Sequence, residues 1–329
     1  MIRILNLVLV LFLAGSIYGQ MLSNKDTVLM GSAFSFTGVH SSQEEGDNAI
    51  DAAIAEVVRI EALISSWNID SKTSEINKNA GISPVEVPLE LFNLIERSKK
   101  ISELSNGYFD ISFASIDKIW DFKQDSIEIP TAEELKQSVK NINYENIILE
   151  REKMTVFLKE SEMKIGFGAI GKGYAANQAK NIMLSFGVES GVVNAGGDLI
   201  SWGEHPEKDM WTIGVVNPLK KNEVAICLDI KETAVVTSGN YEKFVEIDNK
   251  KYCHIINPKT GWPCNGLASV TIVCKDAEFA DAMATTVFVL GANEGMKLIN
   301  HLAGVEGVLI DEKGIVFYSN NLKSNAVKN

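Results

Sequence analysis

The order of strand-like and helix-like runs is the feature that most constrains the fold of this 329-residue chain. From residue 154 onward, short runs rich in β-branched and aromatic residues are mixed with longer runs of helical spacing. The strand-like runs lie at 154–158, 192–194, 211–216, 224–230 and 269–273, and the helix-like runs at 174–186, 277–290 and 294–302. Because regular βαβ alternation is lacking, the pattern favours an α+β fold over a doubly wound parallel sheet.

The first half of the chain carries helical signals. Apolar residues recur on one face of a helix expected over 47–65, and a second helix is expected from Pro88 to the stop signal Asn106-Gly107. Thr131 and Glu134 stand three residues apart and predict a capping box that opens a third, short helix. Because no long Pro/Gly/Ser linker divides the chain and its 7 prolines are scattered, residues 20–329 are predicted to form one unit.

The first 19 residues have the layout of a secretory signal peptide. A short positive start is followed by an apolar stretch from Ile4 to Ala14, interrupted by Asn6, and then by small residues up to Gly19. The stretch is shorter than the roughly 20 residues that span a bilayer, although an uncleaved anchor or a buried helix remains an alternative. We expect export to the periplasm, with cleavage after Gly19 and association with the membrane left open.

The formal net charge of −12 argues against nucleic acid as a partner, because the chain has no basic excess to displace counterions. An anionic ligand is compatible with this charge only where a cation or a helix N-terminus neutralises it locally.

A glycine-rich turn at residues 166–173 precedes one of the expected helices. Its glycines match a dinucleotide-binding fingerprint and most of a P-loop. Gly173 lacks the hydroxyl that a P-loop needs after its lysine, and the surrounding pattern is not that of a Rossmann fold. The features common to both motifs remain: close backbone approach, a helix N-terminus and the cation of Lys172. A plain turn is the alternative.

The spacing of the four cysteines fits no zinc site. Cys227 and Cys274 lie in strand-like runs and are predicted to be buried. Cys253 and Cys264 could close a short loop, and whether they form a disulfide stays open.

Several motifs follow one another in an order that resembles a known family, the FAD:protein FMN transferases (the ApbE family). The resemblance covers about residues 28–291. The motifs are Met30-Gly31-Ser32, Ser66-Trp67-Asn68, Ser74–Asn77, Asn106–Ser112, Gly166–Ala175, Val193–Asp198, Thr237–Tyr241, His254–Gly261 and Ala280–Thr286.

The resemblance implies largely antiparallel sheets flanked by helices, and an exported enzyme that binds FAD and Mg²⁺. Such an enzyme transfers the FMN part of FAD to a threonine hydroxyl of an acceptor protein and releases AMP. A flavin-carrying subunit of a membrane redox complex is the acceptor that it implies. The FAD-contacting positions are Met30, Trp67, Tyr108, Phe109, Asp110, Lys172, His254 and Ile255, and the metal positions are Ala169 (backbone), Asp281 and Thr285.

The residues themselves agree with these roles. Asp281 and Thr285 are four apart in a helical run, so their oxygens share a face and suit Mg²⁺. A solvated pair is the alternative. His254 is expected to assist proton movement or to bind pyrophosphate, and Lys172 to stabilise charge, while a hydrogen-bonded loop residue is the alternative for His254. Asp198 is expected either to position the acceptor hydroxyl or only to stabilise the turn at the end of a strand.

Other candidates and departures qualify this assignment. Trp67, Tyr108 and Phe109 are expected either to stack on a ring system or to belong to the core. Gly166 and Asn177 stand where the family often has acidic residues. Gly166 lacks a side chain that could bond to FAD, which concerns nucleotide affinity or selectivity rather than the fold, whereas Asn177 keeps its hydrogen-bonding capacity.

Two rival functions use the same FAD site. With water as nucleophile the protein would be a Mg²⁺-dependent FAD pyrophosphatase, and without chemistry it would be a flavin-binding protein. The presence of Asp281, Thr285 and Lys172 argues against pure binding, because binding alone does not require a metal at the pyrophosphate.

Overall fold

The computed structural model describes residues 21–116, 119–120, 129–220, 222–241, 244–247 and 250–322. The expected signal segment, residues 1–19, lies outside the described residues. Within the described part of the chain, no helix combines the length and the apolar character needed to cross a membrane.

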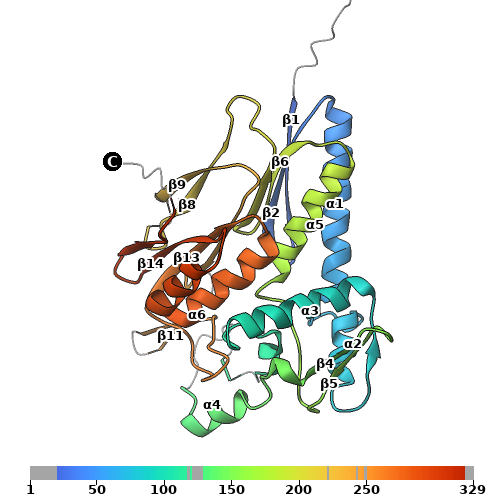
Figure 1. The fold of residues 1–329 in the computed structure, drawn as a ribbon, viewed down its shortest axis with the longest axis vertical. Coiled ribbons are helices and arrows are strands. Elements are labelled where there is room, and N and C mark those ends of the chain that lie inside the picture. Colours follow the sequence, from blue (N-terminus) through green and yellow to red (C-terminus); the bar gives the residue numbers. More distant parts are fainter. Residues whose placement is uncertain are drawn as a thin grey trace, which may run out of the picture.

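An antiparallel sheet of eight strands forms the centre of the fold, in the order β1-β2-β6-β7-β10-β13-β14-β15 (Figure 1). Its strands are β1 (Met21–Leu29), β2 (Ser32–His40), β6 (Ser190–Ala195), β7 (Asp198–Trp202), β10 (Ala234–Gly239), β13 (Leu267–Cys274), β14 (Glu306–Asp311) and β15 (Val316–Tyr318). The hairpin β1–β2, which the sequence patterns did not indicate, pairs with β6 about midway along the chain.

Both faces of this sheet are covered, so neighbouring residues of a strand point into different cores. Val192, Leu199 and Val235 face a core that is completed by the hairpin of β8 (Trp211–Val216) and β9 (Val224–Ile230). Their successors Val193, Ile200 and Val236 belong to the larger core under the helices. Strands buried on both faces read as continuous apolar runs, which is how the sequence presents them.

The helices that contribute to the larger core include α1 (Gln43–Ile64), α5 (Gly171–Ser185) and α6 (Ala277–His301) (Figure 1). The first begins four residues before its expected start because Ser42 caps it by accepting the N–H of Glu45. The two helix-like runs expected at 277–290 and 294–302 form one element with a break at Gly291, whose φ of 78° is not helical. Glycine adopts that φ without strain.

The remaining elements form the part of the molecule drawn below these helices in Figure 1. They are α2 (Lys72–Lys78), β3 (Val85–Glu86), α3 (Leu89–Leu104), the 3₁₀ helix η1 (Ile111–Ser115), α4 (Ala132–Ser138), the 3₁₀ helix η2 (Tyr144–Asn146), β4 (Ile147–Glu150), β5 (Thr155–Leu158), and the pair β11 (Phe244–Ile247) and β12 (Lys250–Cys253).

The expected start of α4 and the expected end of α3 are confirmed. The capping box of Thr131 and Glu134 opens α4, and Asn106 follows α3 with a φ of 51°. All strand pairs in the described residues are antiparallel, and the chain is a single compact α+β unit, as predicted.

The four cysteines are free thiols. Cys274 is buried as predicted, whereas the prediction for Cys227 is wrong: it is half-buried in β9. The thiol of Cys253 points toward Cys264, with its Sγ atom 3.2 Å from the carbonyl oxygen of that residue. Burial raises the pKa of the Cys264 thiol to about 12.

Candidate functional site

The glycine-rich turn leads into the first turn of α5. The residue before the helix, Ile170, supplies no side-chain hydrogen bond, and the first turn contains no acidic residue. One of its N–H groups, that of Gly173, instead donates to Oδ2 of Asp281 on α6 at 3.0 Å. The N-terminus of α5 therefore accommodates a carboxylate from a neighbouring helix, as the helix dipole favours.

Gly173 is the point where the two helices meet. A Cβ atom at this position would lie 2.1 Å from the carbonyl oxygen of Ala277 and 2.8 Å from Cβ of Asp281. Any side chain would therefore force α5 and α6 apart. The absence of a side chain at Gly173 brings Asp281, which is 4% exposed, against the start of α5.

Thr285 lies one helical turn after Asp281 and is half-buried. Its Oγ1 atom is 3.5 Å from the hydroxyl of Ser238, near the end of β10. In the register of the sheet, Val236 on the same strand pairs with Asp198 at the start of β7. The helical pair Asp281/Thr285 and the β6–β7 turn thus lie toward the same end of the sheet.

The oxygen atoms at this end suit a hard divalent cation. Asp281 offers a carboxylate and Thr285 a hydroxyl, and Ala169, half-buried in the turn before α5, offers a backbone carbonyl. Among the described residues no group of three or more His, Cys, Asp or Glu side chains is placed to hold a metal. A cation held by one carboxylate, neutral oxygens and ligand phosphates is typical of Mg²⁺, so the donor set fits that ion.

Lys172 forms an ion pair at the same helix start. Its Nζ atom lies 2.8 Å from Oδ2 of Asp198, and the side chains are 23% and 1% exposed respectively. Asp198 reaches this position because Gly196 and Gly197 adopt φ values of 64° and 103° in the turn before it. The structure therefore joins Lys172, Asp198 and Asp281 around the first turn of α5.

Met30 and the loop that contains Trp67 flank the glycine-rich turn. Met30 has a φ of 50°, and its N–H donates to the carboxylate of Glu61 at 2.9 Å. Its terminal methyl lies 3.6 Å from where a Cβ of Gly171 would stand, and the hydroxyl of Ser66 lies 3.4 Å from the corresponding point at Gly166. Trp67, next in sequence, is 89% exposed, so its ring is open to a ligand.

The segment 108–110 presents one half-buried ring and two inward side chains. Phe109 is 2% exposed and belongs to the main core. Asp110 accepts hydrogen bonds from Ser112 and from the N–H of Tyr144, and burial raises the pKa of its carboxyl group. A contact of either residue with FAD would therefore come from the backbone. Tyr108 is half-buried and its ring is available to a ligand.

His254 and Ile255 lie in a loop that is joined to Tyr108. His254 is half-buried, and Ile255 is buried with its carbonyl accepting the N–H of Cys264 at 2.8 Å. From the same loop, Nζ of Lys259 lies 4.1 Å from the centroid of the Tyr108 ring, within the range of a cation–π contact. This contact links two of the segments that carry expected FAD-binding residues outside the glycine-rich turn, 108–110 and 254–255.

Both departures from the family pattern have structural consequences. A Cβ at Gly166 would lie 3.1 Å from Cβ of Ala114, so space for a larger side chain is tight. Asn177 caps α6: its amide donates to Asp276 at 2.9 Å and accepts the N–H of Ala277 at 3.1 Å. An acidic residue at 177 would face the carboxylate of Asp276.

Sequence reasoning missed Ser238 and Lys259, although both lie inside motifs that it quoted. It also missed Arg97, which contacts α5 and α6 from outside every motif. No local pattern at Arg97 indicates these contacts, because they depend on how the helices cross.

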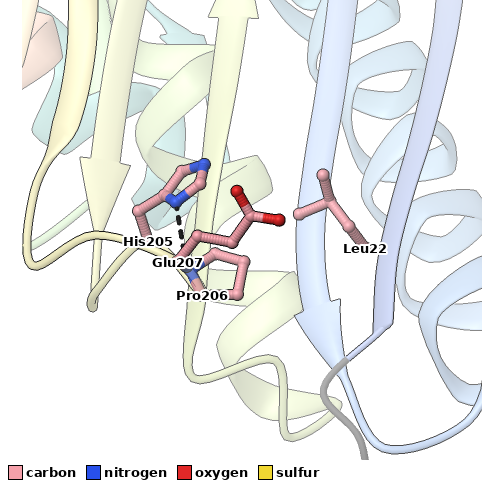
Figure 2. A pocket seen from close by; sticks show the side chains of 4 residues that line it. All are labelled: Leu22, His205, Pro206 and Glu207. Carbon is pink, nitrogen blue, oxygen red and sulfur yellow. Dashed lines mark hydrogen bonds between the residues drawn. The ribbon is translucent and has the colours of Figure 1, made fainter.

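A shallow hollow of about 490 Å³ lies apart from these residues, between β1 and the segment after β7 (Figure 2). It is lined by Leu22, His205, Pro206 and Glu207, with the N–H of Glu207 donating to Nδ1 of His205 at 3.1 Å. None of the expected site residues takes part in it.

Known proteins resemble this chain over most of its length. The profile of the ApbE family matches residues 30–309. The FAD:protein FMN transferase of Klebsiella pneumoniae is 29% identical over 83% of this chain and 85% of its own length. That of Treponema pallidum is also 29% identical, over 79% of this chain and 77% of its own.

Solved structures agree with this result. The crystal structure of the ApbE protein of Thermotoga maritima superposes with a TM-score of 0.84 at 31% identity, covering 91% of this chain and 97% of that one. The flavinyl transferase ApbE of Pseudomonas stutzeri shares the fold, with a TM-score of 0.81 at 22% identity over 92% and 96% of the two chains. The chain described here belongs to the ApbE family.

Proposed function

We propose that this protein is a FAD:protein FMN transferase that works with Mg²⁺ and modifies a threonine of an acceptor flavoprotein. The relatives that match most of the chain carry the transferase name. The observation that carries the proposal is the contact of Asp281 with the N–H of Gly173, because it sets an oxygen ligand pair beside Lys172 at one helix start.

Asp281, Thr285 and the backbone carbonyl of Ala169 would hold the Mg²⁺ ion. When bound, Mg²⁺ supplies neutralisation of the charge on the phosphate oxygens of FAD. The buried position of Asp281 fits this role, since its carboxylate is held by the Gly173 N–H and does not need to be ordered on binding.

In the proposed reaction the threonine oxygen attacks the phosphorus on the FMN side of the pyrophosphate. A new O–P bond forms, the P–O bond to the AMP phosphate breaks, and AMP leaves with the bridging oxygen. Lys172 stabilises the negative charge that develops on the leaving phosphate, and its pairing with Asp198 holds the ammonium in place before the substrate arrives.

The proton of the threonine hydroxyl needs an acceptor. His254 is proposed for this step because it is half-buried in a loop that contacts Tyr108 through Lys259, and a neutral imidazole accepts a proton near neutral pH. The exposed ring of Trp67 and the ring of Tyr108 are proposed to contact the ring systems of FAD.

Location and acceptor are part of the same proposal. Residues 1–19 are proposed to direct export to the periplasm, and the acceptor is proposed to be a flavin-carrying subunit of a membrane redox complex. N-terminal sequencing of the protein from its native host tests the first point: a mature chain starting at Gln20 supports it, and an intact Met1 in the cytoplasm contradicts it.

Release of AMP from FAD distinguishes the candidate functions. The purified protein is incubated with FAD and Mg²⁺, with and without an acceptor domain that contains a target threonine. AMP release that depends on the acceptor, with flavin covalently attached to it, supports the transferase. Release at the same rate without acceptor would show a FAD pyrophosphatase, and binding of FAD without AMP release would show a binding protein.

A further inference from the structure

A partly buried ion pair anchors the beginning of α6. Arg97 on α3 donates from Nε and Nη2 to the two carboxylate oxygens of Glu278, at 2.7 and 2.9 Å. The Glu278 side chain is 8% exposed and that of Arg97 is 42% exposed, so the arginine covers the carboxylate from solvent. Two parallel hydrogen bonds of this kind fix orientation as well as distance.

Arg97 also reaches the beginning of α5. Its guanidinium lies 5.8 Å from the centroid of the Tyr174 ring. The hydroxyl of Tyr174 donates to Glu90 on α3 at 2.5 Å, and Glu90 accepts two hydrogen bonds from Arg59 on α1, each of 2.8 Å. A continuous set of polar contacts therefore joins α3 to the first turns of α5 and α6, and Figure 1 shows α3 running across the ends of the long helices.

The two residues that Arg97 contacts stand next to the proposed site. Glu278 lies one helical turn before Asp281, and Tyr174 directly follows Gly173. At Gly173 the helices approach so closely that a Cβ atom would lie 2.1 Å from the carbonyl oxygen of Ala277. A small rotation of the first turn of α6 would therefore change both the Asp281–Gly173 contact and the direction of the Asp281 carboxylate.

We propose that Arg97 is a positioning residue for the metal site, acting through Glu278 on Asp281. This inference rests on the proposed function, since it takes Asp281 to be a ligand of the divalent cation. Without Arg97, the buried carboxylate of Glu278 would have lost its ion-pair partner one turn from the carboxylate of Asp281. Repulsion between the two charges and the cost of burying an unpaired one would both move the first turn of α6.

Mn²⁺ binding tests this role independently of turnover. The full mature chain is titrated with Mn²⁺ in the presence of FAD and without acceptor, and free Mn²⁺ is followed by electron paramagnetic resonance. The variants are Arg97→Met, Arg97→Lys, Glu278→Gln and the double variant that combines Arg97→Met with Glu278→Gln. Asp281→Ala is the reference for loss of the metal site. Thermal unfolding without ligands is recorded for each, and binding is measured well below every midpoint.

Arg151→Met is the matched control. Arg151 lies outside α3 and pairs with a glutamate of that helix, Glu96, at 2.8 Å, and its guanidinium lies 4.9 Å from the ring centroid of Phe92. Arg151 thus makes the same two kinds of contact as Arg97, an ion pair and a cation–π contact, with α3 as its partner and with a more exposed glutamate. Its described contacts involve neither α5 nor α6, so it should reduce stability without changing Mn²⁺ affinity.

The expected result for Arg97→Met is Mn²⁺ binding weaker by about 10- to 100-fold, the range typical of residues that orient a metal ligand. Arg97→Lys should recover part of the loss, because it keeps the charge but not the paired hydrogen bonds. The double variant should lose no more than Arg97→Met, since both changes act through one pair.

Two results would overturn the inference, and they can be told apart. Wild-type affinity in Arg97→Met together with a lowered unfolding midpoint would make the arginine structural and leave the proposed function standing. A wild-type protein that binds Mn²⁺ no better than Asp281→Ala would instead remove the metal site, and with it the metal part of the proposed function.

Discussion

Nζ of Lys172 lies 2.8 Å from Oδ2 of Asp198, and this ion pair connects the first turn of α5 with the start of β7. Asp198 is 1% exposed, so the lysine offsets part of the cost of burying its charge. A variant that removes Lys172 alone changes two properties together: the charge available to the substrate and the pairing of a buried carboxylate. Stability and activity must therefore be separated.

Lys172→Met should lower the free energy of unfolding by about 1–3 kcal/mol, less than for a fully buried pair because the lysine is partly exposed. Adding Asp198→Asn should restore most of this loss, since the buried charge is then absent. Urea unfolding of both variants measures it. A double variant that is no more stable than Lys172→Met would show that the pairing of Asp198 does not limit stability.

Both folded variants should release AMP roughly 10²-fold more slowly, with a smaller change in the affinity for FAD. The physical reason is that charge on the leaving phosphate grows during bond cleavage and is small in bound FAD. FAD titration followed by flavin fluorescence gives the affinity, and acceptor-dependent AMP release gives the rate. An equal loss in both quantities would place the role of Lys172 in binding.

Asp281→Asn should remove most of the metal-dependent transfer without unfolding the protein. Asparagine keeps an oxygen for the N–H of Gly173 but lacks the negative charge that binds a cation. At limiting Mg²⁺ we expect a decrease of at least about 100-fold, in line with several kcal/mol of metal-assisted stabilisation. The rate is measured against Mg²⁺ concentration, and full turnover of the variant at limiting Mg²⁺ would refute the metal assignment.

His254→Ala should slow flavin transfer by about 10²–10⁴-fold while FAD still binds, the usual contribution of general acid–base catalysis. Covalent flavin on the acceptor is quantified over time by its fluorescence in denaturing gels. His301→Ala, at the exposed end of α6, is the control and should transfer at the wild-type rate. If His254→Ala does so too, the hydroxyl is activated by another group, such as Asp198.

Gly173→Ala should destabilise the protein by about 1–3 kcal/mol or more, because its Cβ would overlap the backbone of α6. Gly168→Ala, five residues earlier, is the matched control: its Cβ would meet only the Phe113 ring, at an ordinary distance of 3.5 Å. Thermal unfolding of both variants measures the difference. Equal midpoints would mean that α5 and α6 separate without cost.

Asn177→Asp should make stability depend on pH in a predictable direction. The new carboxylate would face Asp276, which accepts a hydrogen bond from Asn177 in the wild-type protein. Repulsion should raise the folded-state pKa of the new carboxyl group at position 177. The variant should therefore lose stability as pH rises above about 4, the pKa of that group in the unfolded chain. Urea unfolding between pH 4 and pH 7, measured against the wild type as the reference, checks this; a constant difference would contradict it.

Local features of the sequence predicted local structure well. The capping box at Thr131, the end of α3 just before Asn106, and the placement of Asp281 and Thr285 on one helix were all found from local residue types and spacing. The reason is that capping and helical periodicity depend on residues within about four positions of each other, which the sequence displays directly. The order of the motifs likewise identified the family before any contact was known.

Contacts between distant segments were decided by the tertiary structure. The pairing of β2 with β6, the ion pair of Lys172 with Asp198 and the contact of Arg97 with α6 join positions far apart in the chain. The inward position of Phe109, which spacing could not separate from a ligand-facing one, was settled in the same way. These features depend on how the helices and the sheet pack, and packing is a sum over many long-range contacts that no local pattern records.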